Sequence, residues 1–221
     1  MRFLCLHGVG TNSKVLEIQT APLRYEIGDG HTYDFVEGIF PYELAPEIRD
    51  LVVADDQGFS YFDPHSVSAS LQAVNDLERF IEEEGPYDGV LGFSQGMMLA
   101  CTLLMRKVQE KKALPFKCAI FFSPRMAPLD YVDLGRGKFT EINPLDIIDK
   151  IRIPTALVWG SVDPHAAKAI ELQQLFPPEI LSTVVHDGGH EIPGYAFKDA
   201  LAETVKVIRR TTDEAGRTFC T

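Results

Sequence analysis

A serine framed by two glycines is the most chemically suggestive feature of the chain. Ser94 is the centre of the sequence GFSQG at positions 92–96, which has the G-x-S-x-G spacing of a nucleophile elbow. Glycines suit this spacing because side chains two residues before and after a strained, exposed serine would collide. The hydroxyl would then stand at a helix N-terminus, where partial positive charge favours an oxyanion. The motif therefore predicts a nucleophilic serine.

A serine hydroxyl needs a general base at neutral pH, and six histidines compete for that role. His190 stands in the segment DGGHEIP at 187–193, after the last predicted strand. A glycine-rich loop there reaches over the carboxyl edge of a sheet, and the order serine, acid, histidine also selects it. His186, at the end of the same strand, is the remaining candidate. The other four histidines lie less suitably, in the first loop, before the second strand, in a long insertion and at a helix start: His7, His31, His65 and His165.

An acid is expected between the serine and the histidine in sequence, to accept Nδ1–H of the base and fix its tautomer. Asp163 follows the predicted strand 154–160 and a short turn, which is the expected place. An Asp-Pro pair is elsewhere usually a turn or a helix cap. Asp187 and Asp149 are weaker rivals.

Two backbone N–H groups are required to hold the oxyanion. Gln95 supplies one as the residue after the nucleophile. Val9 is the best candidate for the other, in the sequence HGVG at 7–10. A phosphate-binding turn is the alternative for this glycine-rich loop, but neither G-x-G-x-x-G nor a P-loop lysine follows.

Apolar runs and helical periodicities alternate along the chain and predict the scaffold for these groups. The expected strands are 2–7, 33–37, 88–93, 116–122, 154–160 and 183–186, and the expected helices are 14–26, 66–84, 95–112, 165–175 and 195–210. Ser13 is the predicted cap of the first helix, and 211–221 is predicted to be a frayed, mobile tail.

Strands that alternate with helices predict an α/β fold, a mostly parallel sheet of about six strands with helices on both faces. Right-handed crossovers favour the strand order 2-1-3-4-5-6. A ligand crevice then opens between the first and third strands. The loop at 7–10 and the elbow at 93–95 end those two strands, so they are predicted to meet.

Composition indicates a single domain over 1–221, since 221 residues with 45% apolar and 24% charged residues suit one core. A net charge of −11 without a basic cluster argues against nucleic acid and anionic membranes as partners.

The N-terminus does not resemble a signal peptide, and no run reaches the ~20 apolar residues of a membrane span. Four dispersed cysteines lack metal-ligand spacing, and Cys5 and Cys118 fit the core, so a reducing, cytoplasmic location is expected.

Two loop-rich segments on the carboxyl side of the sheet are predicted to form a cap over Ser94, at 38–65 and 123–145. Their Phe40, Tyr61 and Met126 are candidates for the wall of an apolar acyl pocket. Burial of the same residues within the loops themselves is an equally good interpretation.

These motifs together resemble the fungal serine hydrolase (FSH-type) family of compact α/β-hydrolases, and the resemblance covers nearly the whole chain. It is carried by the segments FLCLHGVGTN at 3–12, FVEG at 35–38, YDGVLGFSQG at 87–96, FSPR at 122–125, GSVD at 160–163 and GGHEIP at 188–193. The elbow is also similar to that of acyl-protein thioesterases and carboxylesterases, but Met97 replaces a glycine usual there. The family includes fungal thioesterases that release or edit polyketides.

The resemblance implies hydrolysis of acyl esters or acyl-thioesters by Ser94, Asp163 and His190, without metal or cofactor. The implied substrate is a small or carrier-bound acyl group, with a polyketide synthase as a possible partner and polyketide or fatty-acyl thioesters of secondary metabolism as candidates. General carboxylesterase or acyl-protein-thioesterase-like activity is the alternative. A second alternative is a non-catalytic ligand-binding protein with the same fold. A third alternative is acyl transfer or carbon–carbon hydrolysis by the same serine.

Overall fold

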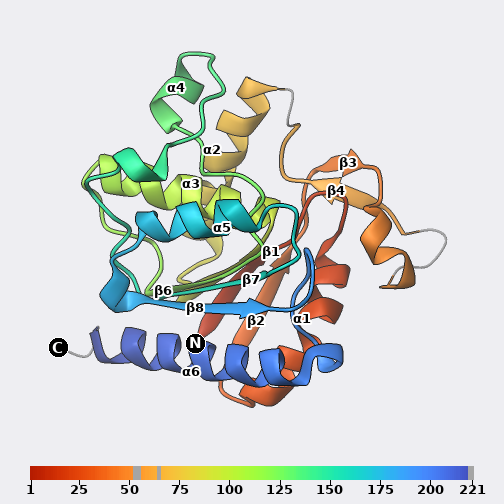
Figure 1. Ribbon diagram of the computed structural model, residues 1–221. Coiled ribbons are helices and arrows are strands. Elements are labelled where there is room, and N and C mark those ends of the chain that lie inside the picture. Colours follow the sequence, from red (N-terminus) through yellow and green to blue (C-terminus); the bar gives the residue numbers. More distant parts are fainter. Residues whose placement is uncertain (52–55, 64–65, 219–221) are drawn as a thin grey trace.

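A six-stranded parallel sheet forms the centre of the protein in a computed structural model, which describes residues 1–51, 56–63 and 66–218 (Figure 1). The strand order is β2-β1-β5-β6-β7-β8, and every neighbouring pair is parallel. This order confirms the predicted topology. The strands are β1 (Arg2–Leu6), β2 (Thr32–Val36), β5 (Gly89–Phe93), β6 (Cys118–Phe122), β7 (Thr155–Gly160) and β8 (Leu181–His186).

Helices cover both faces of this sheet (Figure 1). On one face lie α1 (Ser13–Ile27) and α6 (Lys198–Thr218), and on the other lie α2 (Val67–Glu84), α3 (Gln95–Gln109) and α5 (Ala166–Leu172). β1 shows how one strand serves two cores: Phe3 and Cys5 face the α1 side, while Leu4 and Leu6 face the α3 side. Apolar residues therefore run continuously along the central strands, as burial on both faces requires.

Capping side chains determine where two of the helices begin. Ser66 caps α2 by accepting a hydrogen bond from Ala69 N–H. Asn12, rather than the predicted Ser13, caps α1, because its Oδ1 accepts a hydrogen bond of 2.8 Å from Val15 N–H. Ser13 is instead engaged with Glu37, to which its amide and hydroxyl both donate at 2.9 Å.

The insertion at 38–65 has structure of its own and holds the loop after β1. β3 (Phe40–Tyr42) and β4 (Gly58–Ser60) pair antiparallel, and the short helix η1 (Pro46–Leu51) lies between them in sequence. Gly10 N–H donates to Phe59 O at 2.9 Å, and Phe59 N–H donates to Thr11 O at 2.7 Å. Positions 52–55 and 64–65 of the predicted cap lie outside the described residues.

The predicted second cap segment, 123–145, packs elsewhere. It contains α4 (Tyr131–Gly135) and leads into the short helix η2 (Pro144–Asp146), and Figure 1 shows α4 beside α2. Leu129 N–H donates to Thr102 Oγ1 of α3 at 3.0 Å, and the Tyr131 hydroxyl donates to Asn75 of α2 at 2.8 Å. Polar groups on those two helices hold the segment there, so the prediction that it caps Ser94 was wrong for most of its length.

The C-terminal helix is longer than predicted. α6 continues through Thr218 instead of ending at Arg210, so the mobile tail predicted from 211 was wrong as far as 218, and 219–221 lie outside the described residues. Thr211 and Ala215 are 1% and 0% exposed, which shows that the added turns are packed against the core. Three further short helices are η3 (Gln173–Leu175), η4 (Pro178–Ile180) and η5 (Tyr195–Phe197). None of the described helices has the length and apolarity to cross a membrane.

Candidate active site

Ser94 lies in a strained turn between β5 and α3. Its φ of 52° and ψ of −111° place it in a region that residues with a side chain rarely adopt. Both flanking glycines are sterically required. A Cβ on Gly92 would lie 2.6 Å from Met97 Cα, and one on Gly96 would lie 2.2 Å from Leu6 O. The turn therefore has the close packing that the G-x-S-x-G spacing predicted.

Ser94, His190 and Asp163 form one hydrogen-bonded chain. Ser94 Oγ lies 2.9 Å from His190 Nε2, and His190 Nδ1 lies 2.8 Å from Asp163 Oδ2. The Asp163 side chain is 1% exposed, and its other oxygen accepts a hydrogen bond of 2.8 Å from His165 N–H. A buried carboxylate accepts from Nδ1–H, so His190 presents the lone pair of Nε2 to the serine hydroxyl.

None of the competing histidines and acids among the described residues makes a hydrogen bond with the Ser94 hydroxyl. Among them, His186 is 2% exposed, and its Nδ1 accepts a hydrogen bond of 3.1 Å from Gly188 N–H. Burial lowers the pKa of His186, which keeps it uncharged. Asp187 and Asp149 are exposed and make no hydrogen bond with a described histidine. His65 lies outside the described residues.

The ring of His165 packs edge-on against His190, with 5.9 Å between centroids. Burial first, and then the positive charge of Arg125, lower the pKa of His165. A neutral ring beside His190 adds no opposing charge when His190 takes up a proton.

The two amides expected to hold an oxyanion lie close together at the ends of β1 and β5. Gly96 N–H donates to His7 O at 3.0 Å, which ties the first turn of α3 to the loop after β1. Neither Val9 N–H nor Gln95 N–H donates to any described residue. Unpaired amides beside a serine hydroxyl are the donors that an oxyanion requires.

A cleft of about 660 Å³ opens over Ser94 and His190. Much of its apolar wall comes from three separate segments: α1, the insertion and η5. The residues are Ile18, Pro22, Ala45, Ile48, Tyr195 and Phe197. The insertion therefore borders the site, as predicted, but through η1 and the residue before it rather than through its aromatic residues.

Phe40, Tyr61 and Met126 do not line this cleft. Tyr61 is 7% exposed, and its hydroxyl accepts from His7 N–H and donates to Val36 O, both at 2.8 Å. Phe40 and Met126 are partly buried against the core on the α3 side of the sheet. The prediction that these three residues wall the site over Ser94 was wrong, because they pack in or against the core on the α3 side of the sheet instead.

Two residues that bear on the site were not predicted in these roles. The Gln95 side chain accepts from Tyr61 N–H at 3.0 Å and exchanges hydrogen bonds with Ser60 Oγ, so it joins the elbow helix to the insertion. Arg125 lines the cleft with Ser94, and its guanidinium makes no hydrogen bond or ion pair with any described residue. The position of Arg125 after a strand end was visible in the sequence, but its unpaired state was not.

Comparisons with known proteins show the family of the chain. The family model described as serine hydrolase (FSH1) matches residues 1–200. An esterase from Fusarium mangiferae, FPY3, is 40% identical over 216 residues, which cover 94% of this chain and 96% of that protein. A hydrolase from Fusarium oxysporum f. sp. lycopersici, FUB4, is 29% identical over 267 aligned positions, covering 93% of this chain and 98% of that protein.

Solved structures share the fold at lower identity. A carboxylesterase from Mesorhizobium loti superposes with a TM-score of 0.59 at 17% identity, covering 94% of this chain and 88% of that one. SOBER1 from Arabidopsis thaliana gives a TM-score of 0.57 at 17% identity, covering 96% of this chain and 99% of that one. The solved structures thus show an α/β-hydrolase fold, and the family match over residues 1–200 and the related esterase show that the chain belongs to the serine hydrolase (FSH1) family and is a hydrolase acting on esters.

Proposed function

We propose that the chain cleaves acyl esters and acyl-thioesters through a covalent acyl-enzyme on Ser94. Ser94 Oγ attacks the substrate carbonyl carbon while His190 Nε2 takes the hydroxyl proton, and Asp163 stabilises the resulting imidazolium. The carbonyl oxygen becomes an oxyanion held by the amides of Val9 and Gln95. His190 then protonates the leaving alcohol or thiol, activates a water molecule against the acyl-enzyme, and the free acid departs.

The observation that carries this proposal is the continuous hydrogen-bonded chain at the floor of an open cleft. The contacts of 2.9 Å from Ser94 to His190 and 2.8 Å from His190 to Asp163 lie within the range for direct proton transfer. The serine hydroxyl borders a cleft of about 660 Å³, large enough to accept an acyl chain.

We further propose thioesters of polyketide or fatty-acyl chains in secondary metabolism as the physiological substrates, delivered by a carrier such as a synthase. The motifs at 3–12 and 87–96, which resemble those of fungal polyketide-releasing thioesterases, support this part of the proposal. The apolar cleft wall also supports it, since Ile18, Ile48 and Phe197 suit a hydrocarbon chain.

The position of Arg125 supports the proposal that the substrate carries an anionic group, such as a carboxylate or a phosphate. The side chain lines the cleft without a hydrogen bond or ion pair to the described residues, in a chain whose net charge is −11. The acidic member of the same lining, Glu191, is already engaged, because its carboxylate accepts a hydrogen bond of 3.0 Å from Gly189 N–H. A guanidinium with free donors binds such oxyanions in a forked geometry.

The test combines a fluorophosphonate probe with acyl-thioesters and matched oxygen esters of graded chain length. We expect the probe to label the wild type at Ser94, and Ser94→Ala to lose both labelling and turnover by several orders of magnitude. A Ser94→Ala variant with wild-type turnover would refute the nucleophile. Turnover of oxygen esters alone would limit the proposal to a carboxylesterase, and tight ligand binding without any turnover would indicate a binding protein.

A further inference from the structure

The carbonyl of Gly8 is held by three donors, an unusual concentration for one peptide group beside the cleft. Thr11 Oγ1 donates to Gly8 O at 2.8 Å, Thr11 N–H donates to it at 3.2 Å, and His7 Nδ1 lies 2.7 Å from it. Both side chains are buried: His7 is 0% exposed and Thr11 is 2% exposed. Their donors are therefore committed to this carbonyl rather than to solvent.

The proton on His7 is assigned by its neighbours. Gly8 O has no hydrogen to offer, so Nδ1 must carry the proton in their 2.7 Å contact. On the other side of the ring, Gly38 N–H donates to Nε2 at 2.9 Å, and Glu37 Oε1 lies 3.0 Å from the same nitrogen. Whichever of these two neighbours uses Nε2, Nδ1–H still points at Gly8 O.

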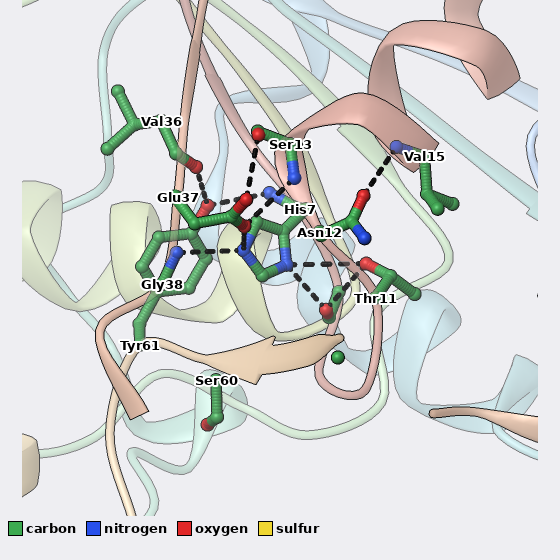
Figure 2. A network of polar contacts seen from close by, with 12 residues as sticks. His7, Thr11, Asn12, Ser13, Val15, Val36, Glu37, Gly38, Ser60 and Tyr61 are labelled. Carbon is green, nitrogen blue, oxygen red and sulfur yellow. Dashed lines mark hydrogen bonds and ion pairs between the residues drawn. The ribbon is translucent and has the colours of Figure 1, made fainter. Parts of the chain in front are cut away.

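Further contacts fix the ring and the chain that carries it. Figure 2 shows His7 between Glu37 and Gly38 on one side and Thr11 on the other. The ring of Tyr61 lies against the imidazole with 4.7 Å between centroids, and the Tyr61 hydroxyl accepts from His7 N–H. Burial raises the pKa of Tyr61 well above its usual value, so that hydroxyl keeps its proton and its donor role toward Val36 O.

The Gly8 carbonyl and the Val9 amide belong to the same peptide plane. The bond between these residues is trans, because the only cis peptide among the described residues joins Gly85 and Pro86. In a trans peptide the C=O and N–H bonds point to opposite sides. Donors that hold Gly8 O on the interior side therefore direct Val9 N–H to the opposite side, where Gly8, Val9 and Ser94 border the cleft.

We infer that Thr11 and His7 are positioning residues that hold the Gly8–Val9 peptide with its amide toward the oxyanion. His7 lies outside the cleft lining, and Thr11, which borders it, is only 2% exposed, so both are placed to act through the carbonyl end of this peptide. The inference rests on the proposed oxyanion role of Val9. It also explains why a hydroxyl stands at position 11, where the backbone contacts with Phe59 alone would fix the loop path but not this peptide's orientation.

Thr11→Val tests the inference because valine keeps the shape of threonine and removes the hydroxyl donor. Thr11→Ser restores the donor. Thr155→Val is the matched control, because Thr155 is also 0% exposed and donates to a backbone carbonyl, Ile153 O, at 2.9 Å. Thr155 is the first residue of β7, so it lies at the amino ends of the strands, whereas the cleft lies at their carboxyl ends. Measured for each variant are kcat, KM, thermal unfolding and the affinity of a trifluoromethyl ketone that forms a hemiketal oxyanion on Ser94.

We expect Thr11→Val to lower kcat by roughly 10- to 100-fold with KM within about twofold, since only the transition state bears the oxyanion. Trifluoromethyl ketone affinity should fall by a similar factor, and Thr11→Ser should recover most of both. Thr155→Val should lose comparable thermal stability but keep kcat and inhibitor affinity. Equal kcat in Thr11→Val and Thr155→Val would overturn the inference. The proposed function would still stand in that case, provided that Ser94→Ala is inactive. An active Ser94→Ala would remove both.

Discussion

Ser94 Oγ lies 2.9 Å from His190 Nε2, although 96 positions separate the two residues in the chain. β5 delivers the serine and the loop after β8 delivers the histidine, and three strand pairings, β5–β6, β6–β7 and β7–β8, lie between them. Because all of these strands are parallel, their carboxyl ends share one edge of the sheet. The contact is thus a consequence of the strand order, and the hydrogen-bonded chain to Asp163 after β7 fits the same edge.

Asp163→Asn tests whether Asp163 sets the tautomer of His190. The side chain keeps its shape but presents an amide, which favours a proton on Nε2 and so removes the base that Ser94 needs. We expect kcat to fall roughly 10⁴-fold, while the unfolding temperature stays within a few degrees of the wild-type value. Asp187→Asn is the control, since Asp187 is an exposed acid near His190 in sequence. A large loss in the control, with Asp163→Asn still active, would assign the acid to position 187.

The sheet and the three residues of the hydrogen-bonded chain were predictable because the central strands and the elbow have local signatures. β5, β6 and β7 are buried throughout, and such strands read as unbroken apolar runs. The elbow at 92–96 has a spacing that only a tight strand-to-helix turn explains. Asp163 and His190 follow from chain order once the strands are placed.

The pocket wall was not predictable in the same way, because its residues come from segments that meet only in the folded chain. Tyr61 illustrates the error: an aromatic residue in a loop suggests a ligand site, yet its hydroxyl bonds Val36 O and the His7 amide in the interior. The end of α6 illustrates a second error of prediction. Thr211 and Thr212 weaken the apolar pattern, but both are buried in the continuing helix, and the Thr211 hydroxyl is satisfied by Val207 O at 3.0 Å.

Glu37 should contribute a pH-dependent increment to stability. Burial raises the pKa of its carboxyl, but the contact with His7 and the hydrogen bonds from Ser13 outweigh burial and lower the pKa overall. A carboxyl whose folded-state pKa is depressed stabilises the fold above its unfolded pKa of about 4.3, and this is lost as pH falls through the folded value. Because the carboxyl is 40% exposed, the increment should not exceed about 1 kcal/mol.

We therefore expect Glu37→Gln to unfold at lower denaturant concentration than the wild type at pH 7, and the two curves to converge as the pH falls below about 4. Denaturant unfolding measured between pH 3 and pH 8 checks the trend. Glu43→Gln is the control, since this exposed carboxyl makes no hydrogen bond or ion pair with a described residue. A Glu37→Gln difference that grew in acid would contradict the assigned direction.

Arg125→Gln should change substrate preference rather than the chemistry. We expect kcat/KM to fall about 10-fold or more for acyl substrates with a terminal carboxylate or a phosphate-bearing leaving group, and to stay within about twofold for neutral ones. Arg125→Lys should retain only part of the wild-type kcat/KM for the anionic substrates, because an ammonium lacks the forked donors of a guanidinium. The loss should shrink as salt rises, and competition with inorganic phosphate should weaken in the variant. An equal loss for neutral and anionic substrates would show that Arg125 supports the loop instead of binding an anion.

Acyl-chain preference should depend on the cleft wall that the structure identifies, not on the residues first predicted from the loops. Ile18 lies on α1 with 40% of its surface exposed, so Ile18→Ala removes apolar wall at little cost to the fold. Each methylene buried against such a wall contributes about 0.8 kcal/mol, which corresponds to roughly fourfold in kcat/KM. Wild-type kcat/KM should therefore rise with chain length until the cleft is filled.

Ile18→Ala and Phe197→Ala should lower this rise, losing more activity on long acyl esters than on acetyl esters. Met126→Ala is the matched control: Met126 is a partly buried apolar residue that lies against the α3 side of the core and outside the cleft. It should reduce stability while leaving the slope of kcat/KM against chain length unchanged. A flattened slope in Met126→Ala, with a normal slope in Ile18→Ala, would move the acyl site away from the cleft between α1, η1 and η5 and toward the loop at 123–145.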